Sequence, residues 1–183
     1  MEKLMGMRVA ILTTNGVEES ELTEPLEALR QNGAEVDILS PDGGEVQMMR
    51  HDDKTRKIAS TGRIADANPD DYTAVMLPGG VVNADELRMN EDARTFVRRM
   101  QDSGRTIAAI CHAPWLLVSA GLVRGKHLTS FHTLQDDIRN AGGTWTDEEL
   151  VRDGNWITSR SPRDLPAFNQ ALVDATSRVQ RAA

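Results

Sequence analysis

The sequence predicts a doubly wound α/β sandwich, in which helices cover both faces of a mostly parallel central sheet. Short apolar runs alternate with segments of helical period along the chain. The run at 105–110 is built from small and branched residues with little polar content, which is typical of a strand buried on both faces. No repeat, low-complexity stretch or linker interrupts the alternation, so we expect a single domain over residues 1–183.

The first part of the chain predicts strands separated by one long helix. The apolar, branched run 8–13 predicts the first strand. A helix is expected next, up to Gln31, because Leu22, Leu26 and Leu29 recur at helical spacing. The other strands expected before residue 78 lie at 35–39, 45–49, 57–59 and 72–77, with a charged loop between the second and third of them.

The second part of the chain continues the alternation after a loop that follows Leu77. This loop is expected to carry Asp85 and Glu86. Further on, the pattern predicts helices at 91–103, 114–120, 134–140 and 166–178, and strands at 105–110, 127–130, 150–152 and 156–158.

Composition excludes several classes of protein. The 21 basic and 28 acidic residues give a net charge of −7, which argues against a nucleic-acid binder that tracks phosphates. No apolar run approaches the roughly 20 residues that a membrane helix needs, and the first residues show no secretion signal. The single cysteine, Cys111, cannot form an intrachain disulfide and suits a reducing compartment, so we expect a cytoplasmic protein.

Sites on such sheets lie outside the carboxyl ends of the strands, which directs attention to Cys111. It follows the buried-type strand directly and precedes a helix that Pro114 helps to open. Free N–H groups and the helix dipole at that turn favour the thiolate, so we expect a lowered thiol pKa. His112 is a candidate to take the thiol proton. The alternatives are a small buried cysteine and a turn histidine bonded to the backbone.

Carboxyl groups follow the other two strand ends. Glu21 lies at the edge of the leucine stripe, where it can turn toward the Cys111 sulfur, and burial there would raise its pKa so that it donates a proton. Asp85 or Glu86 can orient His112 as the third group of a triad. The alternative for each acid is a solvated surface position.

The sequence gives no support for a metal or a cofactor. His112 and His132 are not accompanied by an HExxH motif or by paired cysteines, so no zinc site is expected. Gly79 and Gly80 do not form a GxGxxG or Walker loop, which argues against nucleotide binding, and no GxSxG elbow occurs.

The segment 109–114 (AICHAP) resembles the nucleophile-elbow motif of the ThiJ/PfpI superfamily. Residues 16–22 resemble the acidic first-loop segment of that family, and 77–80 match its next signature. The segments 136–142 and 153–160 resemble two distinctive later stretches. The similarity runs from about Arg8 to Val173, and the greatest resemblance is to the PfpI-type branch.

This resemblance implies a flavodoxin-like fold and a homo-oligomer that is a dimer or a multiple of one. Cys111 aligns with the nucleophilic, redox-sensitive cysteine, Glu21 with the acid that hydrogen-bonds it, and His112 with the histidine of the PfpI-type site. Asp85 falls near the position where that branch supplies a glutamate from the neighbouring subunit, although the loop after Gly80 is one residue longer here and the acid is shorter.

Three functional hypotheses follow. The first is a stress-protective hydrolase of the deglycase or glyoxalase type, acting on small-molecule, glycated or peptide substrates. Cys111 would attack, Glu21 would move protons, the amides of Gly79, Gly80 and His112 would hold an oxyanion, and His132 would line the pocket. The alternatives are an intracellular cysteine peptidase with a Cys–His–acid site at a subunit interface, and a non-catalytic oxidation sensor or chaperone-like stress protein.

Overall fold

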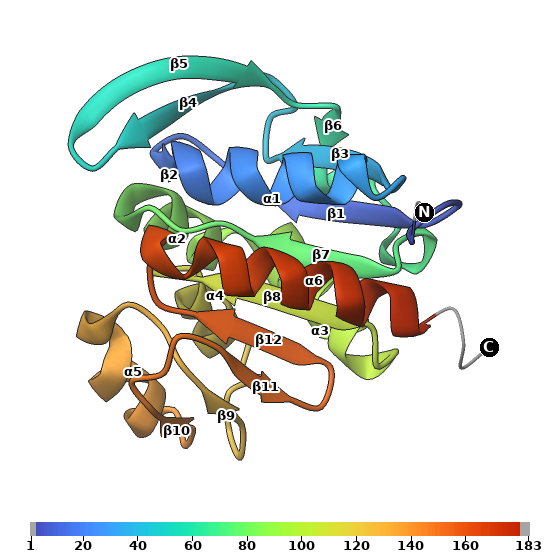
Figure 1. Cartoon of the computed structure of the whole chain (residues 1–183). Coiled ribbons are helices and arrows are strands. Elements are labelled where there is room, and N and C mark those ends of the chain that lie inside the picture. Colours follow the sequence, from blue (N-terminus) through green and yellow to red (C-terminus); the bar gives the residue numbers. More distant parts are fainter. Residues whose placement is uncertain (1–2, 180–183) are drawn as a thin grey trace.

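The computed structural model describes residues 3–179 and confirms the α/β sandwich (Figure 1). Its centre is a seven-stranded sheet in the order β11-β12-β8-β7-β1-β3-β6. All neighbouring strands are parallel except β11, which runs antiparallel to β12 at one edge. The bounds are β1 Arg8–Leu12, β3 Glu35–Ser40, β6 Gly62–Arg63, β7 Ala74–Leu77, β8 Thr106–Ile110, β11 Val151–Asp153 and β12 Trp156–Ser159.

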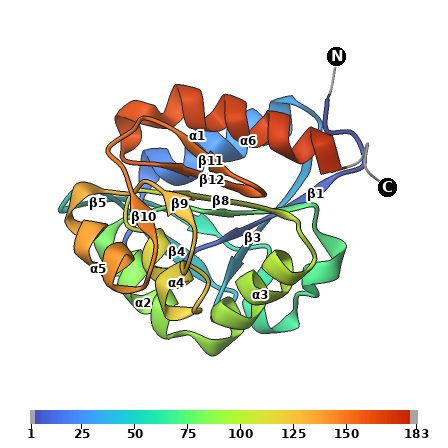
Figure 2. The same ribbon diagram turned by 90° about the horizontal axis from the view of Figure 1, so that it is seen from below.

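Helices cover both faces of this sheet, as Figure 2 shows from below. One face carries α1 and α6, and the other carries α2, α3 and α4. Each side forms its own apolar core because each helix turns one stripe to the sheet; Leu22 and Leu29 of α1 and Phe96 of α3 are buried in this way. The bounds are α1 Glu19–Gln31, α2 Val81–Met89, α3 Glu91–Asp102, α4 Pro114–Ser119, α5 Gln135–Asn140 and α6 Leu165–Val179.

Two small sheets and four short 3₁₀ turns complete the described part of the chain. The antiparallel hairpin of β4 (Glu45–Arg50) and β5 (Asp53–Ala59) pairs with β2 (Val17–Glu18), beside the loop after β1. The second small sheet joins β9 (His127–Leu128) to β10 (Thr144–Trp145). The turns are η1 Ile64–Asp66, η2 Pro69–Asp71, η3 His132–Leu134 and η4 Pro162–Asp164.

The strand order places the ends of β1, β7 and β8 side by side. From β1 the chain first extends the sheet through β3 and β6, then returns to the other side of β1 and continues through β7, β8 and β12. The direction of winding therefore reverses between β1 and β7, and such a switch point is where open α/β sheets bind ligands. The loops after Leu12, Leu77 and Ile110 meet at this edge.

The structure corrects two expected loops. The segment after Gly80 is the helix α2, so Asp85 and Glu86 are helical residues. The strand β5 begins at Asp53, inside the stretch that was expected to be the charged loop of the hairpin.

Within residues 3–179, no helix combines the length and the apolar character needed to cross a bilayer.

Candidate functional site

Cys111 stands at a sharp turn between β8 and α4. Its φ is +62°, in the left-handed region that a residue with a Cβ rarely adopts. The turn is fixed on both sides, because Cys111 N donates to Ser159 O at 3.1 Å and Cys111 O accepts from Phe131 N at 2.8 Å. Backbone strain held in place by its surroundings is a feature of functional sites, and here it belongs to the candidate nucleophile.

Glu21 is brought to this turn by the first turn of α1. Its side chain is completely shielded from solvent, and its Oε2 accepts a hydrogen bond from Gly79 N at 2.9 Å. Its other oxygen, Oε1, is buried and has no hydrogen-bond partner among the described residues, and the carboxyl lies close enough to the Cys111 side chain for each group to shift the pKa of the other. Burial, assisted by the charge of Glu18, raises the pKa of Glu21 to about 8. The carboxyl is therefore protonated at neutral pH and able to donate, as the sequence predicted.

The expected lowering of the Cys111 thiol pKa is wrong for the described chain. Burial raises this pKa well above its usual value, since the residue is only 7% exposed, and the charge of Glu21 adds to the effect. The N–H groups of Gly80 and His112 act in the opposite direction. The short helix α4 begins only at Pro114, so its dipole does not outweigh the loss of solvent at the sulfur.

His112 lies beside the sulfur and is neutral at physiological pH. Its Nδ1 is 3.1 Å from Cys111 Sγ, and its Nε2 is 3.5 Å from Thr133 Oγ1. The ring stacks on Phe131, with centroids 4.6 Å apart, and meets the edge of Trp115 at 5.4 Å. Burial lowers the pKa of His112 to about 4, with a smaller contribution from His132. An unprotonated imidazole nitrogen at this distance can accept a hydrogen bond from the thiol.

The other expected site residues lie farther out. Asp85 is exposed on α2, and Glu86 Oε2 accepts a hydrogen bond from Thr14 Oγ1 at 3.4 Å. Among residues 3–179, neither carboxyl is hydrogen-bonded to His112. His132 is exposed, and its ring packs on Phe131, which in turn stacks on His112.

The two glycines after β7 have different roles. The Gly79 amide is taken by Glu21, so it is not a free oxyanion donor, whereas the Gly80 amide faces the Cys111 sulfur. A Cβ on Gly79 would lie 2.6 Å from Cys111 Cβ and would collide with the Glu21 carboxyl, so only glycine fits there.

Two contributors to this site were not foreseen from the sequence. Phe131 closes one side of the His112 ring, and the side chain of Asn83 is buried under the glycine loop. Neither lies in a recognisable motif. The sequence offers one indirect sign of Asn83. It is a polar residue in the segment directly after Gly80, and the apolar residues of that segment do not follow a helical period.

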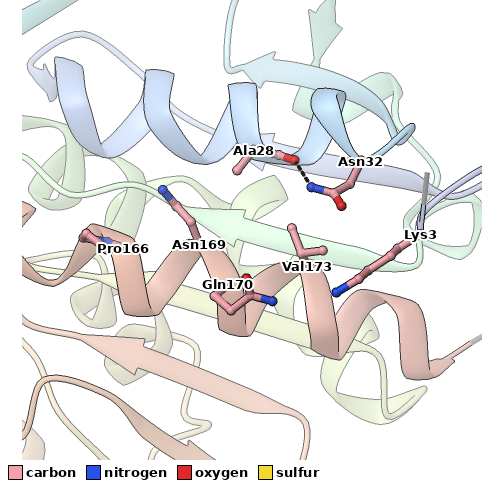
Figure 3. Close-up of a pocket in the computed structure, with 7 residues that line it drawn as sticks. All are labelled: Lys3, Ala28, Asn32, Pro166, Asn169, Gln170 and Val173. Atoms are coloured by element: carbon pink, nitrogen blue, oxygen red, sulfur yellow. Dashed lines mark hydrogen bonds between the residues drawn. The ribbon is translucent and has the colours of Figure 1, made fainter. Parts of the chain in front are cut away.

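A surface hollow elsewhere on the molecule does not belong to this site. It has a volume of about 180 Å³ and lies between α1 and α6 (Figure 3). Its lining includes Lys3, Asn32, Asn169 and Gln170, and none of the candidate site residues. Over the described chain, no three His, Cys, Asp or Glu side chains gather as metal ligands would.

Comparison with known proteins confirms the resemblance seen in the motifs. The model of the DJ-1/PfpI family matches residues 7–175. Deglycase PfpI of Pyrococcus furiosus is 38% identical over 167 residues, which cover 91% of this chain and 98% of that protein. Protein/nucleic acid deglycase 2 of Escherichia coli is 36% identical over 170 residues, covering 92% and 97%. The crystal structure of Drosophila melanogaster DJ-1beta has a TM-score of 0.85 at 26% identity and covers 97% of both chains.

Proposed function

Because the chain belongs to the DJ-1/PfpI family, we propose that it is a stress-protective deglycase-type hydrolase with Cys111 as its nucleophile. Relatives that match over nine-tenths of the chain are named deglycases. The observation that carries the proposal is the contact of one strained thiol with both a buried carboxyl and a neutral imidazole.

The geometry suits addition of the sulfur to the carbonyl carbon of an aldehyde-derived adduct. His112 Nδ1 is placed to take the thiol proton as the S–C bond forms. The charge that develops on the carbonyl oxygen would be stabilised by the Gly80 amide and by a proton from Glu21. Collapse of the hemiaminal releases the amine and gives the aldehyde carbon that the sulfur attacks, so the addition product is a hemithioacetal. Transfer of the proton on that carbon to the adjacent ketone carbon, through an enediol, oxidises the first carbon to a thioester and reduces the second to an alcohol. Water then hydrolyses the thioester, which gives a 2-hydroxy acid and the free thiol.

The test uses N-acetyl-lysine treated with methylglyoxal. The wild-type protein is expected to release free amine and lactate, and Cys111→Ala is expected to release neither above the uncatalysed rate. Equal rates for the two proteins would contradict the proposal. Selective oxidation of Cys111 by mild peroxide in a protein without turnover would support the oxidation sensor instead.

Together with this function, we propose an assembly, a domain organisation and a cellular location for the chain. We propose a homo-oligomer because Val81, Val82 and Met89 are exposed apolar residues on α2, next to Asp85. A second copy on this surface would bring an acid near the interface, as the peptidase hypothesis requires. We also propose one domain over 1–183 and a cytoplasmic location, which the lone cysteine favours. Light scattering and cell fractionation test the assembly and the location.

A further inference from the structure

Asn83 is a fully buried polar side chain for which the proposed reaction has no direct use. It lies in the first turn of α2 and is 0% exposed. Its Oδ1 accepts hydrogen bonds from Thr14 N at 2.8 Å and Thr13 Oγ1 at 3.3 Å. Its Nδ2 donates to Pro78 O and Gly79 O, both at 2.9 Å. The amide thus uses two acceptor positions and both donor hydrogens, and it ties the end of β1 to the loop after β7.

The two carbonyls that Asn83 holds belong to the two peptide groups whose N–H groups point into the site. A trans peptide is planar, so its C=O and N–H point in opposite directions. Peptide 78–79 presents its C=O to Asn83 and its N–H to Glu21 Oε2 at 2.9 Å. Peptide 79–80 presents its C=O to Asn83 and the Gly80 N–H to the Cys111 sulfur. A longer bond, from Glu18 N at 3.4 Å, also reaches Gly79 O.

We propose that Asn83 is the positioning residue of this site, whose single amide aims one peptide N–H at Glu21 and the next at Cys111. Holding both carbonyls fixes the rotation of both peptide planes, and it also polarises them, which strengthens their N–H groups as donors. Asn83 itself takes no part in the reaction. Through these two peptide groups it positions both groups that exchange protons, the Glu21 carboxyl and the Cys111 thiol. This inference rests on the proposed function only in taking Cys111 as the reactive group.

The test measures how fast iodoacetamide alkylates Cys111 between pH 6 and pH 10. In Asn83→Ala the Gly80 amide loses its fixed direction, so the thiolate loses a charge-assisted hydrogen bond. The apparent thiol pKa should rise by about one unit, and alkylation at pH 8 should slow about tenfold. Asn83→Asp keeps the size of the side chain but has no N–H to donate, so it should not restore the wild-type profile.

Leu87→Ala is the matched control on the same helix. Leu87 is also buried, so its loss loosens α2, but it makes no hydrogen bond to the glycine loop. Its alkylation profile should match that of the wild type. The titratable groups that act on the sulfur or on its two partners are Glu21, His112, Glu18 and His132, and no variant changes them.

Thr13→Val keeps the test decisive if Asn83→Ala does not fold. It removes only the hydroxyl that donates to Asn83 Oδ1 and should shift the profile in the same direction by less. A wild-type profile in folded Asn83→Ala, or in Thr13→Val where the alanine variant does not fold, would overturn the inference. An equal shift in Leu87→Ala would overturn it as well. Because the assay contains no deglycase substrate, its outcome is independent of turnover.

Discussion

Replacing Glu21 by glutamine is expected to change how the free energy of unfolding depends on pH. The Glu21 carboxyl is wholly buried, and burial raises its pKa in the folded protein to about 8. In the unfolded chain the same group titrates at its ordinary value of 4.5. Between these two values, the folded state holds a proton that the unfolded state has released.

The sign and size of the effect follow from this difference. The contribution of Glu21 to stability is fully present below pH 4.5 and is lost as pH rises through the folded pKa, because the native state binds the extra proton. The loss is about 1.4 kcal/mol per pH unit, or about 5 kcal/mol across the window. Glutamine does not ionise and can still accept from Gly79 N, so Glu21→Gln lacks this slope.

Urea unfolding of the wild type and Glu21→Gln at pH 5, 6, 7 and 8 measures the difference. The variant should gain stability relative to the wild type with each step in pH. Glu24→Gln, on the exposed face of the same helix, should keep the wild-type dependence. His112 adds its own slope below pH 6.5, but it is present in all three proteins and cancels in the comparison. A constant difference between wild type and Glu21→Gln would refute the reasoning.

Three further outcomes are expected. Gly79→Ala should lower the melting temperature and abolish Cys111 alkylation, because its Cβ would lie 2.6 Å from Cys111 Cβ; a wild-type melting curve by circular dichroism would contradict this. The His112 ring resonances should titrate in NMR with a midpoint near pH 4, because burial disfavours the charged ring, and a midpoint near 6.5 would exclude the buried neutral imidazole. Arg160→Ala should lower the free energy of unfolding in urea by about 3 kcal/mol, because it removes the guanidinium that bonds both carboxylate oxygens of buried Asp164. A decrease below about 1 kcal/mol would show that the remaining hydrogen bond, from Arg160 N to Asp164 Oδ2, is enough to compensate the buried charge.

The sheet and the location of the site could be predicted because both follow from local pattern. Buried parallel strands are almost purely apolar, so the runs ending at Leu12, Leu77 and Ile110 stand out in the sequence. Parallel strands bring their carboxyl ends to one edge, which groups the residues that follow them. The inward position of Glu21 could also be predicted from local pattern, because the residue lies at the edge of the leucine stripe of α1.

The helix α2 and the sulfur's titration could not be predicted, because both depend on packing between distant segments. Val81, Val82 and Met89 are exposed, so the apolar residues of α2 do not mark its buried face, and Gly80 provides no side-chain cap. The helix dipole that favours a thiolate at Cys111 acts only within its own turn. Solvent is removed from the sulfur by other parts of the chain, and that loss decides the direction of the pKa shift.

Glu21 and Cys111 act as one titrating pair, and this decides what the site can do. Burial penalises a negative charge on either group, and each charge penalises the other, so the pair carries at most one charge near neutral pH. With the carboxyl protonated, the N–H groups of Gly80 and His112 are the groups that favour a charge on the sulfur, whereas burial and the contact with Glu21 oppose it. A proton leaves the thiol at little cost only when the resulting charge passes on to a substrate oxygen. The arrangement therefore favours covalent addition in a filled site over a free thiolate in an empty one.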